Sequence, residues 1–441
     1  MRAELDENQM QELLAVPDES LPPIARFARN PADRSLSRIE EEVKNSLDRL
    51  HWKKSLDSGD EVAITAGSRG ISNVAEILTS AVEYLQGRGL RPFVFPAMGS
   101  HGGASAQGQL EVLDSLGITE ETLGCPIKSS METVKIAETE RGFPVYMDKQ
   151  AHQAEGVLVA NRVKPHTSFT GDIQSGLIKM MVIGMGKQQG ARMAHKQAFA
   201  HGLREIVPEV GRLILEEAPV VGGLALVEDF YDQTAIIEGL KPEEFFEEEP
   251  KLLQKSKKLM PTLPTTQADI LIVDEMGKNI SGTGMDTKVV GRIRTLGEKE
   301  PEYPEISRIY ARDLTEESHG NAVGVGLADF VHRRLVDKIK REATYLNCLT
   351  GTGPEKGRIP ITFSQDKTAL KASLASIGTE PSEAKLIWVK NTMDLKEFYL
   401  TRSMIESLEV EEAEQLERRG DWERFKFDNQ GNFIPGEYFG G

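Results

Sequence analysis

The chain is poor in cysteine. Cys125 and Cys348 are its two cysteines in 441 residues; they lie far apart and form no C-x-x-C pair. A disulfide framework and a thiolate metal site both need clustered cysteines, so the sequence supports neither. Isolated thiols are typical of a protein in the reducing cytoplasm, which is the localisation we expect.

Long apolar runs and basic clusters are lacking as well. No stretch reaches the roughly 18 apolar residues of a membrane span, and the N-terminus carries acidic side chains where a secretory signal has a basic start. The formal net charge is −16, and lysine and arginine are scattered along the chain. Proteins that bind nucleic acid present a basic face. We therefore expect a small-molecule partner rather than a membrane or a nucleic acid, and the oligomeric state stays unknown.

The length and the pattern of apolar segments predict two domains. A chain of 441 residues exceeds one hydrophobic core of ordinary size. Short apolar strands alternate with amphipathic helices, which predicts α/β domains with mostly parallel sheets and a cleft between them. A passage rich in proline and threonine near residue 262 marks the boundary. We predict a catalytic domain over 1–265, a second α/β domain over 266–405, and a tail over 406–441 that packs back on the first domain.

Three predicted strands of the first domain end in polar side chains. The strand at 61–65 runs into Arg69, the next strand at 92–96 into His101, and the strand at 156–160 into His166. Adjacent parallel strands bring their carboxyl ends to one edge of the sheet, where ligands bind. Each histidine alone is compatible with an ordinary turn residue, but two imidazoles at one edge suit proton exchange near neutral pH.

The stretch 161–191 holds the densest polar chemistry of the chain and reads as a strand, a loop and a second strand-like run. Lys179 interrupts the second apolar run, where its amine must reach solvent, form a pair or react. A predicted helix over 188–206 follows, and Pro208 interrupts or ends it. His195 and His201 on this helix are six residues apart, so they point to different sides and do not form the metal pair of H-E-x-x-H proteins. His195 lies on a face of small residues and is the better site candidate.

Two familiar motifs are incomplete. Gly184-x-Gly186 resembles the start of a dinucleotide fingerprint, but Gly190 comes one residue late and no acid follows at a strand end. The SHGGAS turn at 100–105 resembles an esterase oxyanion turn, but the sequence has no G-x-S-x-G nucleophile elbow. Dinucleotide binding and serine hydrolysis are both disfavoured.

With these residues in view, the chain resembles the nickel-dependent lactate racemase family, whose members carry a nickel-pincer nucleotide. The family pattern has an Arg after the first strand, a G-[ST]-H turn, a Pro-His loop leading to S-G-x-x-K-like residues, and a downstream nickel-binding His. In this sequence the pattern reads Arg69, Gly99-Ser100-His101, Pro165-His166, Ser175-Gly176-Leu177-Ile178-Lys179 and His195. The resemblance covers most of the first 265 residues.

The resemblance implies a cofactor and the residues that hold it. A pyridinium-3-thioamide-5-thiocarboxylic acid mononucleotide would be attached to Lys179, and its nickel (Ni) would be held by a ring carbon, two sulfurs and His195, a ligand set that suits this metal. Ser175, Gly176 and Gly99 would complete the cofactor site. The enzymes that build this cofactor would then be protein partners.

The resemblance also implies an isomerase. His101 and His166 would act on opposite faces of a 2-hydroxy acid, one removing the hydroxyl proton while the α-hydride moves to the cofactor and later returns to the other face. Arg69 would orient the substrate carboxylate or the nucleotide phosphate, because its planar fork suits either anion. The implied activity is that of a racemase or epimerase that inverts C2.

Two departures from the family pattern concern the substrate. Ala66 stands three residues before Arg69, where relatives of the founding enzyme carry Asp, and residues 170–174 lengthen the loop between His166 and Lys179. We expect this longer loop to border the substrate pocket, and the substrate to be larger or more polar than lactate, such as a sugar acid. The alternatives are a catalytically inactive cofactor-binding homologue and a nicotinamide-dependent dehydrogenase.

Overall fold

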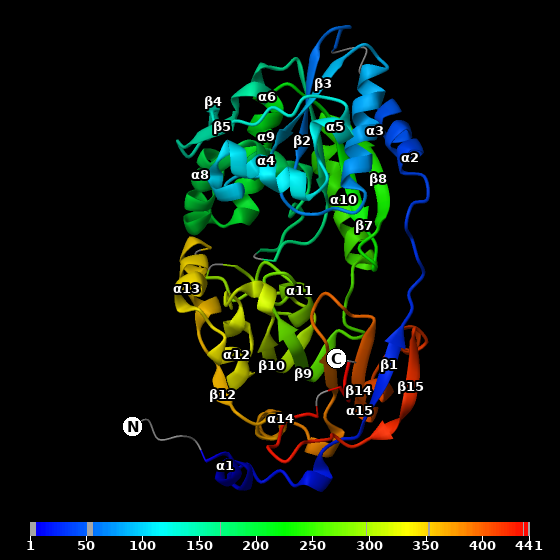
Figure 1. Cartoon of the computed structure of the whole chain (residues 1–441), viewed down its shortest axis with the longest axis vertical. Coiled ribbons are helices and arrows are strands. Elements are labelled where there is room, and N and C mark those ends of the chain that lie inside the picture. Colours follow the sequence, from blue (N-terminus) through cyan, green and yellow to red (C-terminus); the bar gives the residue numbers. More distant parts are fainter. Residues whose placement is uncertain are drawn as a thin grey trace. The chain divides into compact units, whose positions relative to one another are not determined.

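The computed structural model describes residues 6–50, 56–167, 169–296, 298–351, 353–434 and 436–439. The chain divides into two compact units. The central unit is Asp33–Met260, and the terminal unit combines Met1–Ala32 with Pro261–Gly441. Each unit contains a mostly parallel sheet with helices (Figure 1), so the predicted class of two α/β domains is confirmed. Among the residues described, no helix is both long enough and apolar enough to cross a membrane.

The sheet of the central unit has the strand order β3-β2-β6-β7-β8. Its strands are β2 Glu61–Ala66, β3 Arg91–Pro96, β6 Gly156–Arg162, β7 Val220–Glu228 and β8 Thr234–Leu240. β3, β2, β6 and β7 run parallel, and β8 pairs antiparallel with β7. Because β2 lies between β3 and β6, the strand ends that precede Arg69, His101 and His166 are neighbours, as predicted.

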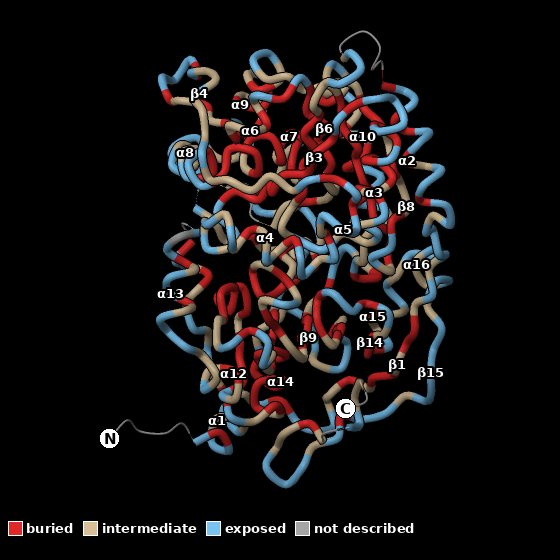
Figure 2. Tube along the Cα trace, turned by 45° about the horizontal axis from the view of Figure 1, so that its top comes forward, coloured by how far each residue is buried: buried red, intermediate tan, exposed pale blue. Residues whose placement is uncertain are grey.

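Alternate residues of the central strands face two separate hydrophobic cores. Val157 and Val159 of β6 pack into one core, and Leu158 and Ala160 pack into the other. Strands buried on both faces have continuous apolar sequences, and Figure 2 shows this part of the chain as mostly buried. The other elements of the unit are α2 Ile39–Asp48, α3 Val74–Gln86, β4 Thr133–Glu138, β5 Pro144–Asp148, α4 Ala106–Ser115, α5 Glu120–Leu123, α6 Lys149–Gln153, α7 Leu177–Lys179, α8 Lys187–His201, α9 Leu203–Glu217 and α10 Phe245–Leu259.

Two predictions for the stretch around Lys179 are wrong. The apolar run after the loop is helical, because α7 continues into a π-helix over Met180–Met185. A short buried apolar run does not distinguish a strand from a helix by its period. The predicted helix over 188–206 is instead split into α8 and α9 at Gly202, whose φ is 77°. Pro208 lies inside α9 and does not end it.

The sheet of the terminal unit has the order β12-β11-β10-β9-β13-β14-β1-β15. Its strands are β1 Ile24–Arg29, β9 Gln267–Met276, β10 Glu305–Leu314, β11 Phe330–His332, β12 Ile361–Phe363, β13 Leu386–Val389, β14 Glu397–Thr401 and β15 Leu416–Glu423. The run from β12 to β13 is parallel, and the strands from β14 to β15 are antiparallel. The helices of this unit are α1 Glu7–Leu13, α11 Thr287–Val290, α12 Arg333–Asp337, α13 Arg341–Thr350, α14 Asp366–Ala375, α15 Arg402–Glu406 and α16 Val410–Ala413.

The structure corrects the predicted domain limits at both ends of the chain. β1 pairs with β14 and β15, so the N-terminal residues belong to the terminal unit and not to a domain over 1–265. The tail packs in that same unit: the Phe433 ring lies 4.5 Å from that of Trp388, and the Phe433 N–H donates to Asp366 over 3.0 Å. The prediction that the tail packs on the first domain is therefore wrong. β15 of the tail pairs with β1, but both strands belong to the terminal unit.

Candidate active site

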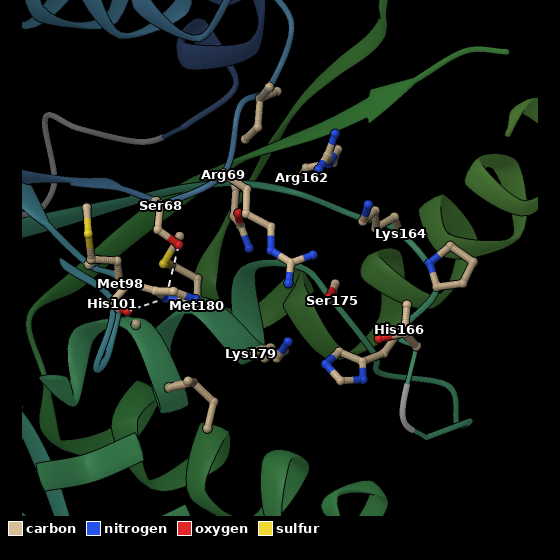
Figure 3. Close-up of a pocket in the computed structure, with 18 residues that line it drawn as sticks. Ser68, Arg69, Met98, His101, Arg162, Lys164, His166, Ser175, Lys179 and Met180 are labelled. Carbon is tan, nitrogen blue, oxygen red and sulfur yellow. Dashed lines mark hydrogen bonds between the residues drawn. The ribbon is translucent and has the colours of Figure 1, made fainter. Parts of the chain in front are cut away.

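A pocket of the central unit opens beside the carboxyl ends of β2, β3 and β6. Arg69 follows β2, His101 follows β3 and His166 follows β6, and all three line this pocket. In Figure 3 the two histidines flank Arg69 and Lys179, whose side chains point into the space between them. The strand order thus brings together residues that are far apart in the sequence.

The other candidate residues divide into two groups. Lys179 and Ser175 line the pocket, whereas Gly99, Gly176 and His195 are not among its lining residues. The Gly99 N–H donates to the Gly184 carbonyl over 3.2 Å, which joins the His101 loop to the π-helix. His195 lies on α8 and is close enough to Lys179 for their charges to interact.

Two further cations line the pocket and were missed from the sequence. They are Arg162, the last residue of β6, and Lys164. Arg162 pairs with Glu228 of β7. Among the described residues that line the pocket there is no Asp or Glu, but Asp232 lies close enough to Arg162 and Lys164 for their charges to interact. The spacing of these residues could have predicted them. Alternate residues of an extended segment point to the same side, and Arg162 and Lys164 lie four and two residues before His166.

The ring of His101 is held by its neighbours. Its Nδ1 lies 2.8 Å from the Met98 carbonyl oxygen and 3.1 Å from the Ser68 hydroxyl. A carbonyl only accepts hydrogen bonds, so Nδ1 carries the hydrogen and donates it. In the neutral ring, Nε2 is then the nitrogen that accepts a proton, which is the state a general base requires.

His166 lies in a loop that is closed by the backbone. The Lys164 N–H donates to the Ser175 carbonyl over 2.9 Å, and the Ser175 N–H donates back to the Lys164 carbonyl over 3.1 Å. The imidazole ring of His166 packs on Phe169 with 4.6 Å between ring centres. The backbone pair and the aromatic contact together fix where His166 enters the pocket.

The passage 170–174 does not border the pocket, contrary to our expectation. Thr167 and Ser175, on either side of it, are the lining residues. Gln174 is buried; its side-chain oxygen accepts from the His166 N–H over 2.7 Å, and its amide donates to the Gly171 carbonyl over 2.9 Å. Gln174 therefore stabilises the His166 loop, because its side chain forms hydrogen bonds within the loop.

Lys179 stands at the junction of α7 and the π-helix. Enclosure by protein, together with the smaller effect of the positive charges of Arg69 and Lys164, lowers the pKa of its amine to about 7. Surrounding protein atoms and, to a smaller extent, the Lys179 charge also lower the pKa of the His195 imidazole, although the residue is exposed at the surface of the central unit. Both nitrogens are therefore biased toward the neutral form, which is the form that attacks an electrophile or binds a metal.

Glu249 of α10 holds the helix that carries Lys179, and no local pattern in the sequence pointed to it. Its buried carboxylate accepts from the Ile178 N–H over 3.1 Å and also from the Leu177 N–H, while burial raises the pKa of this carboxyl to about 7. A carboxylate at the first turn satisfies amides that have no helical partner. A β-carbon at Gly176 would lie 2.4 Å from the Glu249 carboxyl carbon, so glycine is required there.

The lowered pKa of Lys179 gives a testable pH dependence. Below about pH 7 the amine is protonated in the folded and the unfolded protein, but between pH 7 and its ordinary pKa the unfolded protein binds more protons. The free energy of unfolding should therefore rise with pH in this window, by no more than roughly 5 kcal/mol. Chemical denaturation from pH 6 to pH 10 should show a smaller rise for Lys179→Met than for the wild type.

The matched control for this pH dependence is Lys196→Met, which removes an exposed lysine from α8. Its stability should follow the wild-type pH dependence. Parallel pH profiles for the wild type and Lys179→Met would contradict the enclosed, neutral amine.

The described residues contain no group of three or more His, Cys, Asp or Glu side chains arranged to hold a metal ion. A metal at His195 would therefore need most of its ligands from a bound molecule. One neutral imidazole beside a neutral amine is compatible with such a group, which brings its own sulfur and carbon ligands.

Comparisons with known proteins identify a fold. No protein-family model and no curated protein matches the chain. The lactate racemase apoprotein from Thermoanaerobacterium thermosaccharolyticum aligns over 86% of this chain and 95% of its own, with a TM-score of 0.50 and 13% identity. A Thermotoga maritima protein aligns over 82% of this chain and 98% of its own, with a TM-score of 0.51 and 11% identity. The chain has a lactate-racemase-like fold, which at these identities is a statement about architecture alone.

Proposed function

We propose that this protein is an isomerase, a racemase or epimerase that inverts C2 of an anionic 2-hydroxy acid. The observation that carries the proposal is the convergence of His101, His166, Arg69 and Lys179 on one pocket at the carboxyl ends of parallel strands. Two imidazoles supply proton exchange, and the cations supply binding of a carboxylate. The lactate-racemase-like fold is compatible with this chemistry.

The residues present fit a nickel-pincer nucleotide. Lys179 offers a neutral amine for covalent attachment, and His195 offers a neutral imidazole for nickel. Ser175 lines the pocket next to the attachment point, while Gly176 and Gly99 allow the close packing that holds the supporting segments. When bound, this group would supply the site that takes up and returns the hydride of C2. The enzymes that build it would be the partners of this protein in the cell.

The side chains of the pocket then divide the remaining work. Arg69 binds the substrate carboxylate through its planar guanidinium and so fixes C2 between the histidines. His101 accepts the hydroxyl proton at Nε2, because its Nδ1 hydrogen is donated to the Met98 carbonyl. His166 performs the same task from the other side of the pocket. The two histidines exchange roles when the substrate has the opposite configuration, which is why inversion needs both.

The cations that line the pocket indicate the charge and polarity of the substrate. Arg162 and Lys164 line the pocket beside His166, where Glu228 pairs with Arg162 and Asp232 interacts electrostatically with both cations. These side chains suit a 2-hydroxy acid with further polar or anionic groups, such as a sugar acid, better than lactate.

The proposal is tested with a panel of substrates. Protein made together with the cofactor-building enzymes should convert either stereoisomer of at least one 2-hydroxy or sugar acid to the same equilibrium mixture, measured by chiral chromatography. Lactate should react more slowly than a more polar acid. Loaded protein that inverts none of the panel would indicate an inactive homologue, and reduction of added NAD would indicate a dehydrogenase.

A further inference from the structure

Lys187 is a buried lysine that the proposed reaction does not use. It is the first residue of α8, its side chain is 0% exposed, and its φ is 53°, a left-handed value that is unusual for a residue other than glycine. A lysine amine is costly to bury unless each of its hydrogens has an acceptor. Burial of the amine and the left-handed backbone both cost free energy, so contacts of Lys187 must offset that cost.

Three oxygens surround the Lys187 amine, and they come from three different elements. Nζ lies 2.5 Å from the Pro96 carbonyl at the end of β3, 3.1 Å from Oε1 of Gln109 on α4, and 3.4 Å from Oδ2 of Asp148 at the end of β5. An ammonium group has three hydrogens and no acceptor, so this arrangement matches its donors. Lys187 thus joins the end of the strand before His101 to the helix after it.

Lys187 determines which way the Gln109 amide faces. Because the lysine only donates, the side-chain oxygen of Gln109 must point to it and the NH₂ group must point the other way. That NH₂ group donates to the Gly99 carbonyl over 3.0 Å and to the His101 carbonyl over 3.3 Å. Gln109 is 0% exposed, so water does not replace these bonds.

The segment that Gln109 holds needs an external restraint. Gly99, Gly102 and Gly103 all have positive φ values, and glycines leave a backbone many alternatives. The His101 ring keeps its Nδ1 on the Met98 carbonyl only if the backbone between positions 98 and 101 stays folded back. The Gln109 bonds span this turn at both Gly99 and His101.

We propose that Lys187 and Gln109 are positioning residues for His101. Lys187 orients the Gln109 amide, and the amide holds the turn that presents the imidazole. The positioning itself follows from the contacts, and only its consequence for turnover rests on the proposed function. Neither residue lines the pocket.

Gln109→Glu separates positioning from general stability. The new carboxylate keeps an oxygen for Lys187 but removes both donors to the His101 turn, so the fold should survive while the turn loosens. The tautomer of His101 can be read directly from its ring ¹⁵N shifts in protein labelled at its eight histidines, with the His101 signals assigned by His101→Gln. In the neutral ring of the wild type we expect the Nδ1–H form to dominate, because Nδ1 lies against the Met98 carbonyl oxygen.

In Gln109→Glu the ratio of the Nδ1–H to the Nε2–H form should fall roughly fivefold, the effect of losing one ordinary hydrogen bond. Lys187→Met should lower the same ratio, and either variant decides the question if the other does not fold. Gln107→Glu, the same change at an exposed position of α4, should leave the ratio at its wild-type value. A wild-type ratio in folded Gln109→Glu would overturn the proposal. Failure of the wild type to invert any acid would remove the proposed function and leave the tautomer measurement unaffected.

Discussion

Lys179→Ala protein is expected to carry no nucleotide adduct when it is made together with the cofactor-building enzymes, whereas the wild type should carry one adduct on Lys179. The reason is the state of the amine. With a pKa of about 7, roughly half of the Lys179 side chains are neutral at neutral pH, compared with about one in three thousand for an ordinary lysine. Intact mass and peptide mapping measure the adduct, and loss of the mass increase should be complete.

The same experiment separates attachment from metal binding. His195→Ala should keep the adduct and lose most of the bound nickel in elemental analysis, because the imidazole of His195 is the protein ligand in the proposed site. Lys196→Ala on α8 is the control and should keep both. An adduct of wild-type mass in Lys179→Ala would exclude the proposed attachment.

The sequence predicted the edge of the sheet where the site lies, and the reason is local. Each strand of this edge contains a short apolar run, and the polar side chain follows within a few residues of the strand end, so Arg69, His101 and His166 could be placed near strand ends without knowing the fold. The rule that parallel strands share one carboxyl edge supplied the rest. The pairing of β2 with both β3 and β6 is the only tertiary fact that this prediction needed.

The supports of the site could not be predicted in this way. Glu249 reaches the amides of residues 177 and 178 from α10, and in the sequence it stands in an acidic run that reads as an exposed helix face. Gln109 and Lys187 meet because α4 and the start of α8 pack beside the end of β3. Such contacts join residues that are distant in sequence, and nothing in the local composition marks them.

The error at the N-terminus has the same origin. β1 pairs with β14 through Ile24 and Thr401, a contact across nearly the whole chain. A strand pattern shows that a segment is extended but carries no information on its partner. The predicted limit near residue 265 was close to the observed division after Met260, because a proline-rich connection is visible in composition.

His101→Asn and His166→Asn should each lower the rate of inversion by about 10² to 10⁴, the range expected for loss of one general acid–base group. Asparagine keeps a polar side chain of similar shape but does not exchange protons near neutral pH. The adduct on Lys179 should be retained in both variants, since neither histidine is the attachment point. His201→Asn changes an exposed histidine at the end of α8 and should turn over like the wild type.

The pair of variants also decides how many bases the reaction uses. If His101 and His166 act on opposite faces, each is the base for one stereoisomer and the acid for the other, so each single loss should slow conversion in both directions. Chiral analysis started from each pure stereoisomer measures the two directions separately. A variant that inverts at the wild-type rate in both directions would reduce the mechanism to one base, and the remaining histidine would then have to reach both faces of the substrate from one side of the pocket.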